Sequence, residues 1–428
     1  MTAGRPSARA VPGGSAALAE RVGVVVAFAA VHALLWWLNL TLPNLPLGDV
    51  DIAYRQWLAT GASTGVWIGI DLPWVYPVVA LVPMLVAPVF GLGSLVIGWL
   101  VLVTVLDAVA FAFLWRCRFL GVRVGWWWAL LLLALGPIAL GRIDTPATAI
   151  ALVGVVWVLR RPGVAAALLT LAAWIKVWPA ALVGVLLLLR RGHRRAVLVG
   201  AATVTVVVVA IDAVLGGLPE VLSFITQQTG RGLQIESPLA TPFLWLAKAH
   251  VAGAEVYYDR TILTFQVAGT GTATAGVVSS PLMAVVVALA VLLALVAVRG
   301  GARQVEVMPL LALVLVAALL ATNKVGSPQY VGWFAVPIVW GLVAGEASAR
   351  RFLVPAAGVL VLAVATQLVY PAFYNEVLGL QTGILVVLTV RNVLEVAMLA
   401  WGVAALVRIG RQARSVSASA SSLEARPT

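Results

Sequence analysis

The sequence predicts an all-α polytopic membrane protein, and three observations support this fold class. Hydrophobic residues make up 62% of the 428 residues and charged residues only 10%, whereas a soluble domain carries roughly 25% charged residues. A chain this apolar cannot cover a globule with polar surface, so most of its surface must face lipid. The formal net charge of +12 comes from short basic clusters between apolar stretches, which is the pattern of membrane topology and not of a nucleic-acid-binding face.

The apolar stretches and charge clusters predict about twelve membrane helices with both termini in the cytoplasm. A spanning helix needs roughly 20 apolar residues, and cytoplasmic loops collect Arg and Lys. Basic and acidic residues gather in alternate loops, so that one face is basic and the other acidic. The expected helices are 22–42, 94–115, 125–141, 145–159, 164–175, 180–189, 196–215, 281–298, 307–322, 331–345, 352–370 and 383–407.

We expect a single transmembrane domain over residues 21–410, with disordered cytoplasmic tails at 1–20 and 411–428. The first apolar run is longer than the roughly 7–15 residues of a signal-peptide core, so it should remain as a spanning helix. Two long loops, about 43–93 and 216–280, carry most of the acidic residues on the outer face, where we expect function. The excess of Arg over Lys, 25 to 3, predicts a bacterial source with a GC-rich genome, such as an actinobacterium. We therefore expect the protein to lie in the bacterial plasma membrane.

Two apolar stretches do not fit a simple count of spans. The segment Pro73–Gly93 contains four prolines, which break helices at this density, and a span there would place the cluster Arg116–Arg123 outside. We therefore expect a partly inserted element on the outer face, followed by the second span at 94–115.

The second apolar stretch that does not fit the count is Pro162–Leu189, which has basic clusters at both ends. A single helix would place those clusters on opposite faces of the membrane. Two half-helices, 164–175 and 180–189, would keep both clusters inside. Each half-helix has about 12 residues and reaches ~18 Å, which is less than the ~30 Å hydrocarbon core. The turn at 176–179 is then expected deep in the protein beside a cavity, because non-helical backbone at that depth needs protein or water around it.

Several sequence elements resemble those of membrane glycosyltransferases. Residues 48–57 read Gly-Asp-Val-Asp-Ile-Ala-Tyr-Arg-Gln-Trp, and residues 74–77 read Trp-Val-Tyr-Pro. A carboxylate outside the first helix, followed by an aromatic-Pro junction, resembles the GT-C glycosyltransferases. Ala-Trp-Ile-Lys-Val-Trp-Pro at 173–179, followed by Arg-Arg at 190–191, looks like a signature of glycosyltransferase family 87. Gly-Arg-Gly-Leu-Gln-Ile-Glu-Ser at 230–237 and Asn-Lys-Val-Gly-Ser-Pro-Gln-Tyr at 323–330 resemble two further elements of that family.

This resemblance implies a GT-C-like bundle with half-spanning helices and a sugar donor carried on a polyprenyl phosphate. Family members include polyprenol-phosphate-mannose-dependent α-mannosyltransferases, so the expected reaction transfers a hexose, mannose in the first instance, to a lipid or glycan acceptor with inversion. The donor already has a good leaving group. Transfer therefore needs no general acid, only a base for the acceptor hydroxyl and cations for the departing phosphate.

Asp49 and Asp51 are both candidates for the base, and the resemblance does not choose between them. Two residues apart on a helix, they should point to nearly opposite sides, so we expect only one of them to serve, and either could instead cap a short helix. Lys176 is costly in lipid and marks a functional site or an internal ion pair. We expect it to hold the carrier phosphate, or else to pair with Asp144 or Asp107.

Substrate contacts are expected from polar and aromatic side chains in the outer loops and at outer helix ends. Arg231 suits bidentate binding of a phosphate or of sugar hydroxyls, whereas Arg142 and Asp144 could instead form internal ion pairs. Arg391 and Glu395 lie four residues apart in the last span and are expected to pair structurally. The expected substrate-binding residues are Tyr54, Arg55, Tyr76, Arg142, Asp144, Lys176, Arg231, Gln234, Glu236, Ser237, Lys324, Gln329 and Tyr330.

The residue types argue against a metal centre. A single cysteine excludes an intrachain disulfide and a Cys-based zinc site, the three histidines are scattered, and carboxylates form no dense cluster suited to Mg²⁺. We expect no metal, no cofactor and no nucleic-acid partner. The alternative function is a transporter or lipid flippase, which also needs broken helices and buried charges. The two halves of the chain show no internal repeat, which favours the transferase.

Overall fold

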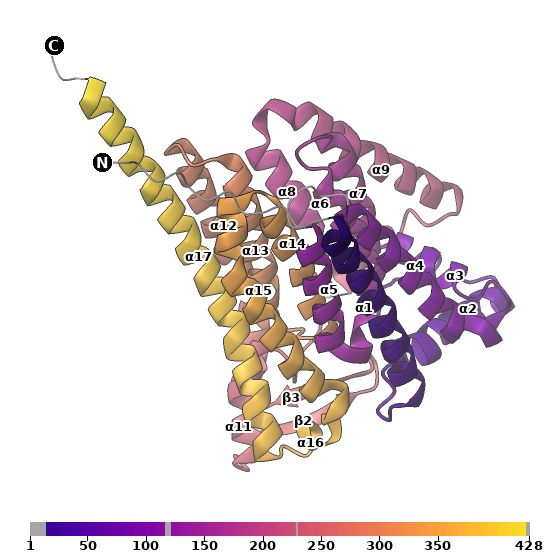
Figure 1. The fold of residues 1–428 in the computed structure, drawn as a ribbon. Coiled ribbons are helices and arrows are strands. Elements are labelled where there is room, and N and C mark those ends of the chain that lie inside the picture. The colour runs from indigo at the N-terminus through magenta and orange to yellow at the C-terminus, as the bar shows by residue number, and fades with distance from the viewer. Residues whose placement is uncertain (1–13, 116–120, 228–229, 425–428) are drawn as a thin grey trace.

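The computed structural model of the chain describes residues 14–115, 121–227 and 230–424. Within these residues, eight helices are long and apolar enough to cross a membrane, which confirms the predicted polytopic all-α class. These helices form the bundle in Figure 1. They are α1 (Gly14–Thr41), α4 (Leu95–Trp115), α5 (Gly121–Leu135), α9 (Arg194–Val214), α12 (Thr272–Arg299), α13 (Gln304–Ala321), α15 (Glu346–Gln367) and α17 (Thr382–Glu424).

Four shorter helices account for the rest of the expected bundle: α6 (Asp144–Val156), α7 (Pro162–Ile175), α8 (Ala180–Leu189) and α14 (Ala335–Val343). The predictions of full spans at 145–159 and 331–345 were therefore wrong in length. The second of these begins as a 3₁₀ segment, η7 (Pro328–Phe334), because Pro328 cannot continue a regular α-helix from before it. Nine of the thirteen residues of α6 and eight of the nine residues of α14 are buried. These helices therefore face mostly protein and do not need full spanning length.

The predicted break between two half-helices is confirmed. α7 ends where Lys176 takes an extended backbone conformation (φ −147°, ψ 127°), and α8 begins after Pro179. Proline fits the start of a helix because the first N–H groups have no partner there in any case. The break places the Lys176 side chain, 13% exposed, at the apex between the two helices.

The proline-rich stretch after the first loop contains only short helices, as predicted. These are η2 (Val78–Ala80), α3 (Leu81–Val86) and η3 (Leu92–Ser94), none of which could span a membrane. α4 approaches the end of α3 closely, since a Cβ on Gly98 would overlap the carbonyl oxygen of Ala87. This contact fixes the first outer loop against the bundle.

The two long loops are largely ordered into short elements. The first contains a π-helical turn, η1 (Asp49–Tyr54), that runs directly into α2 (Arg55–Thr64). The second contains α10 (Ser223–Thr226), β1 (Leu233–Gln234), η6 (Pro238–Ala240), α11 (Thr241–Lys248), β2 (Glu255–Asp259) and β3 (Thr264–Ala268). The strands form an antiparallel sheet in the order β1-β3-β2, which the sequence did not predict. The loop also ends earlier than expected, because α12 starts at Thr272.

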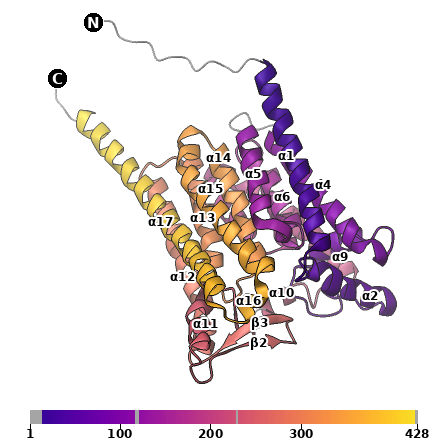
Figure 2. The ribbon, with the colours of Figure 1, turned by 60° about the horizontal axis from the view of Figure 1, so that its bottom comes forward.

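The remaining short elements connect the helices: η4 (Gly136–Ala139), η5 (Arg191–His193), η8 (Leu368–Ala372) and α16 (Tyr374–Leu378). Strands β2 and β3 lie with α11 and α16 at one end of the bundle, whereas α1 begins and α17 ends at the opposite end (Figure 2).

The predicted tails are only partly described. Residues 1–13 of the N-terminal tail lie outside the described residues, and α1 already begins at Gly14. The prediction of disorder from residue 411 was wrong for the described part, because α17 continues as a helix to Glu424. The segment between 411 and 424 contains Arg, Gln, Ala and Leu, which favour helix, and no Gly or Pro that would end it.

Two pairs of ionisable side chains lie inside the bundle at positions that the sequence analysis singled out. Arg391 Nη2 lies 2.9 Å from Glu395 Oε1, and both side chains are buried, which confirms the predicted i,i+4 pair. Asp107 of α4 lies 3.3 Å from His32 Nε2 of α1, so of the two alternative partners predicted for Lys176, Asp107 pairs with a histidine instead.

Close backbone contact between α7 and α9 gives a first test. A Cβ on Gly200 of α9 would overlap the carbonyl oxygen of Gly163, whereas a Cβ on Gly184 of α8 would meet nothing within 4 Å. We expect Gly200→Ala to destabilise the protein by about 1–3 kcal/mol through overpacking. Gly184→Ala should be neutral or stabilising by up to ~1 kcal/mol. Thermal unfolding of the detergent-solubilised variants checks this, and equal melting temperatures would contradict the packing described.

Candidate active site

A polar cavity of about 550 Å³ lies where the two outer loops meet the ends of several helices. Its walls come from η1, the segment before η2, the α7–α8 turn, β1, the β2–β3 hairpin, the start of η7 and the segment around η8. Segments far apart in the sequence therefore converge on one space. Of the predicted site residues, those that line it are Asp49, Tyr54, Tyr76, Arg142, Lys176, Arg231, Gln234, Glu236, Gln329 and Tyr330.

Five predicted site residues do not line this cavity. Asp51 and Arg55 form an i,i+4 pair on the outer surface of the first loop. Asp144 is buried behind Lys176, and Ser237 is buried and accepts a hydrogen bond from the Ala240 backbone N–H. Lys324 lines a second, neighbouring groove.

The two aspartates of the first loop face different surroundings, as the sequence predicted. Asp49 Oδ2 lies 3.3 Å from Nε of Arg142, and the Asp49 side chain is 37% exposed and lines the polar cavity. Asp51 is 49% exposed and pairs with Arg55 instead. The π-helical turn that carries both residues is a conformation often found at functional sites. Geometry thus brings Asp49, and not Asp51, into the cavity.

Arg142 holds Asp49 in place through a buried network. Its guanidinium donates to the backbone oxygens of Pro46 at 2.6 Å and Gly141 at 2.9 Å, and to the hydroxyl of Tyr370 at 3.0 Å. Its side chain is only 8% exposed. A rigid, permanently charged guanidinium therefore lies beside the Asp49 carboxylate and fixes its position at the cavity.

Lys176 lies between one carboxylate and two aromatic rings. Its Nζ is 3.6 Å from Asp144 Oδ2, 4.6 Å from the centre of the Tyr76 ring and 5.3 Å from that of Tyr330. Asp144 in turn accepts a 2.7 Å hydrogen bond from Trp333 Nε1. The alternative prediction of a Lys176–Asp144 ion pair is confirmed, and Lys176 still lines the cavity. Burial alone would lower the pKa of Lys176, but the Asp144 carboxylate and the nearby phenols raise it above its ordinary value, so the ammonium stays charged.

Tyr54 and Tyr76, which line the cavity, cannot act as bases at neutral pH. Burial raises the pKa of Tyr76 to about 12, although the Lys176 ammonium acts in the opposite direction. Burial also raises the pKa of Tyr54 well above its ordinary value, and the Tyr54 hydroxyl accepts a hydrogen bond from the Ile143 backbone N–H. Both phenols therefore remain neutral.

An apolar groove of about 980 Å³ adjoins the polar cavity. Four residues line both spaces: Val75, Lys176, Arg231 and Tyr330. The groove runs along α10, α12 and the end of α13, and is lined mainly by side chains such as Phe224, Ile225, Val277, Met283 and Leu319.

Three cations (Lys176, Arg231 and Lys324) and an aromatic stack lie along this groove. The ring of Trp333 stacks on Trp178 at 5.5 Å and on Tyr330 at 4.1 Å. Arg231 lies at the junction with the polar cavity, and its buried Nε has no hydrogen-bond partner among the described residues. Burial and the positive charge of Arg231 lower the pKa of Lys324. Two neighbouring cations in a partly apolar groove favour an anionic group between them.

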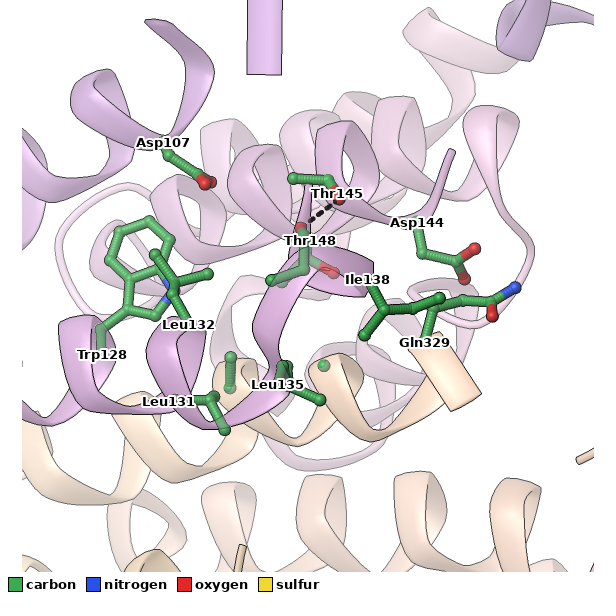
Figure 3. A pocket seen from close by; sticks show the side chains of 13 residues that line it. Asp107, Trp128, Leu131, Leu132, Leu135, Ile138, Asp144, Thr145, Thr148 and Gln329 are labelled. Atoms are coloured by element: carbon green, nitrogen blue, oxygen red, sulfur yellow. Dashed lines mark hydrogen bonds between the residues drawn. The ribbon is translucent and has the colours of Figure 1, made fainter. Parts of the chain in front are cut away.

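A separate, small cavity of about 30 Å³ lies deeper in the bundle (Figure 3). Asp107 lies at one side of it, Asp144 and Gln329 lie at the other, and Thr145 and Thr148 lie between them. A space of this size holds water but not a sugar. Substrate binding is therefore assigned to the polar cavity and the apolar groove.

The structure adds aromatic residues that sequence analysis missed. Tyr370 and Tyr374 line the polar cavity, with ring centres 5.0 Å apart. The sequence signal was weak: a Tyr-Pro step followed by Phe-Tyr at the end of an apolar span, which resembles the Tyr-Pro step at 76–77. No group of three or more His, Cys, Asp or Glu side chains able to hold a metal ion occurs within the described ranges, and the absence of a cofactor stays a prediction.

Comparison with known proteins decides the family. The sequence profile of glycosyltransferase family 87 matches residues 74–322, more than half of the chain. The chain belongs to glycosyltransferase family 87. No curated protein matches the sequence. Family membership makes the chain a multi-pass membrane glycosyltransferase and favours the transferase over the transporter alternative.

The matched region of this family 87 protein includes the half-helix pair, Lys176, Arg231 and Glu236. Asp49 lies before the matched region and Tyr330 after it. Only the fold brings these two residues to the same cavity as the matched ones.

The buried ion pair at the helix break gives a second test. We expect Asp144→Asn to destabilise this glycosyltransferase by about 3–5 kcal/mol, because it leaves the Lys176 ammonium buried without its carboxylate. The double variant Asp144→Asn/Lys176→Met should recover part of this loss. Asp51→Asn, which breaks the exposed pair with Arg55, should cost less than about 1 kcal/mol. Thermal unfolding checks all three, and equal losses for Asp144→Asn and Asp51→Asn would contradict the assignment.

Proposed function

We propose that the protein transfers a hexose, with mannose as the expected sugar, from a polyprenyl-phosphate carrier to a lipid or glycan acceptor. The observation that carries this proposal is the junction of the apolar groove with the polar cavity at Lys176 and Arg231. A lipid-linked sugar has the matching order of parts: an apolar chain, then a phosphate, then a polar ring.

The donor fits this junction by chemistry. Its prenyl chain suits the apolar groove between α10 and α12. Its phosphate suits the guanidinium of Arg231, whose buried Nε lacks a partner among the described residues, and the ammonium of Lys176. Its sugar then reaches the polar cavity. Cations fixed in a low-dielectric site stabilise the negative charge that develops on the departing phosphate.

Asp49 is proposed as the general base. Its carboxylate lines the polar cavity and is held by Arg142 at 3.3 Å. The acceptor hydroxyl oxygen attacks the anomeric carbon, the bond from that carbon to the phosphate oxygen breaks, and the polyprenyl phosphate leaves with the electron pair. Asp49 takes the hydroxyl proton. A single displacement of this kind inverts the configuration at the anomeric carbon, so a β-linked donor gives an α-linked product.

The reaction is proposed to occur at the outer face of the bacterial plasma membrane, with both chain termini in the cytoplasm and without a metal or cofactor. Supporting this orientation, the basic clusters follow the ends of the helices away from the cavity. The end of α17 lies opposite the β2–β3 hairpin that forms part of the cavity wall (Figure 2).

The paired aspartates provide a matched test of the base. Proteoliposomes containing the protein receive radiolabelled polyprenyl-phosphate mannose and a crude envelope lipid extract as acceptor. We expect Asp49→Asn to lower the rate of label transfer by about 10²–10⁴-fold, because the acceptor hydroxyl loses its base. Asp51→Asn should transfer label at nearly the wild-type rate. If Asp51→Asn lost label transfer and Asp49→Asn kept it, Asp51 would be the base. Label that crosses the membrane intact, without transfer, would support a flippase instead.

The cation at the junction gives a separate test on the donor. We expect Arg231→Gln to raise the half-saturating donor concentration by about 10–100-fold, the loss typical of a hydrogen bond to a charged group. The matched control is Arg260→Gln, which removes an exposed arginine from the turn of the β2–β3 hairpin. An Arg231→Gln enzyme with unchanged donor saturation would show that the phosphate binds elsewhere.

A further inference from the structure

One end of the polar cavity has a different character from the junction with the apolar groove. Glu236, Tyr370, Tyr374 and Phe265 line the polar cavity, and none of them lines the groove. The ring of Tyr374 lies 5.0 Å from that of Tyr370 and 6.0 Å from that of Phe265, with both pairs edge to face. These residues form one aromatic wall with a carboxylate in it, which we call the Glu236 wall.

The Glu236 carboxylate is buried and incompletely paired. The residue is 2% exposed. Its Oε1 accepts a 2.8 Å hydrogen bond from the Tyr374 hydroxyl, whereas its Oε2 has no hydrogen-bond donor among the described residues. A buried carboxylate oxygen without a donor is unfavourable by several kcal/mol in general. A ligand hydroxyl that enters the cavity would satisfy it.

Helix α17 holds Glu236 in this position. Arg391 donates to the Glu236 backbone oxygen at 2.8 Å and also pairs with Glu395. Asn392 donates to the backbone oxygen of Ser237. These contacts fix the main chain at Glu236 and Ser237. The Tyr374 hydroxyl holds the carboxylate itself at the cavity wall. The Arg391–Glu395 pair therefore positions a cavity residue in addition to stabilising the helix.

A continuous series of contacts connects the Glu236 wall to the proposed base. Glu236 contacts Tyr374, Tyr374 packs on Tyr370, and the Tyr370 hydroxyl accepts from Arg142 at 3.0 Å. Arg142 contacts Asp49. Lys176 and Arg231, at the groove junction, take no part in this series. Asp49 is thus connected to the Glu236 wall through Arg142, and it shares the polar cavity with the proposed phosphate site.

We propose that the Glu236 wall is the acceptor subsite and that the acceptor presents a sugar ring there. This inference rests on the proposed function. A sugar supplies hydroxyl donors for Glu236 Oε2 and an apolar ring face for the tyrosines. An anionic headgroup is disfavoured, because the wall itself carries a carboxylate and the neighbouring cation, Arg142, is already paired with Asp49. Glu236 and Tyr374 are then specificity-determining residues for the acceptor.

Two probes that share one alkyl chain test the chemical class of the acceptor. Octyl α-mannoside and 1-octanol are compared in proteoliposomes with radiolabelled polyprenyl-phosphate mannose, both as acceptors and as competitors of the envelope lipid extract. We expect octyl α-mannoside to accept label or to inhibit transfer to the extract, and 1-octanol at the same concentration to do neither. Equal behaviour of the two probes would overturn the proposal of a sugar subsite.

Variants of the Glu236 wall test its residues with the same assay. We expect Glu236→Gln to raise the half-saturating concentration of octyl α-mannoside, as acceptor or inhibitor, by about tenfold or more, because a hydrogen bond to a charged oxygen is lost. Half-saturation by the donor should stay within about twofold of the wild type. Tyr374→Phe removes one hydroxyl and keeps the ring, and should raise acceptor half-saturation by a smaller factor. Glu255→Gln, at an exposed glutamate of β2, is the matched control and should change neither value.

The outcomes separate this inference from the proposed function. Size-exclusion profiles and melting temperatures show whether each variant is folded. If Glu236→Gln does not fold, the acceptor half-saturation of Tyr374→Phe is the test. Unchanged acceptor half-saturation in the folded variants, or a shift in donor half-saturation instead, would overturn the acceptor subsite alone. A wild-type protein that neither binds donor nor transfers label would overturn the proposed function and this inference together.

Discussion

The ion pair between Lys176 and Asp144 is the interaction on which the arrangement of the site depends. An isolated charge in an apolar bundle is strongly disfavoured, so the lysine at the α7–α8 break needs a carboxylate from another element. Asp144 at the start of α6 provides it at 3.6 Å and is itself held by the Trp333 indole. The pair thereby joins the broken helix, α6 and η7. Lys176 at the break and Tyr330 of η7 line both the apolar groove and the polar cavity.

Backbone that departs from regular helix lies at each side of the site. The α7–α8 turn, the π-helical turn η1 and the non-helical residue Tyr370 within η8 each aim a side chain into the polar cavity. Irregular backbone is tolerated near the membrane only where protein or water satisfies it. The buried network around Arg142 meets this need, because the guanidinium binds backbone oxygens and side chains from several of these segments. Structural pairing and substrate binding thus use the same charged residues.

Much of the fold was predictable because it follows from local properties of the chain. Apolar length, charge placement and proline density predicted the polytopic class, the short elements after the first loop and the break at Lys176. The lengths of α6 and α14 were wrong because burial against other helices, which the sequence does not show, removes the need to cross lipid. The three-stranded sheet was missed because its strands have only two to five residues, and because β1 pairs with β3 across about 30 residues of sequence.

The sequence by itself determined the membrane class, the family resemblance and the charged residues that line the cavity, because apolar stretches and costly charges are visible residue by residue. Only the tertiary structure decided whether Asp49 or Asp51 faces the cavity. Asp49 pairs with Arg142 at the cavity, whereas Asp51 pairs with Arg55 on the outer surface. The structure also added the Glu236 wall, whose residues come from the second outer loop and the segment around η8. Contacts between segments more than a hundred residues apart leave no pattern in a single sequence.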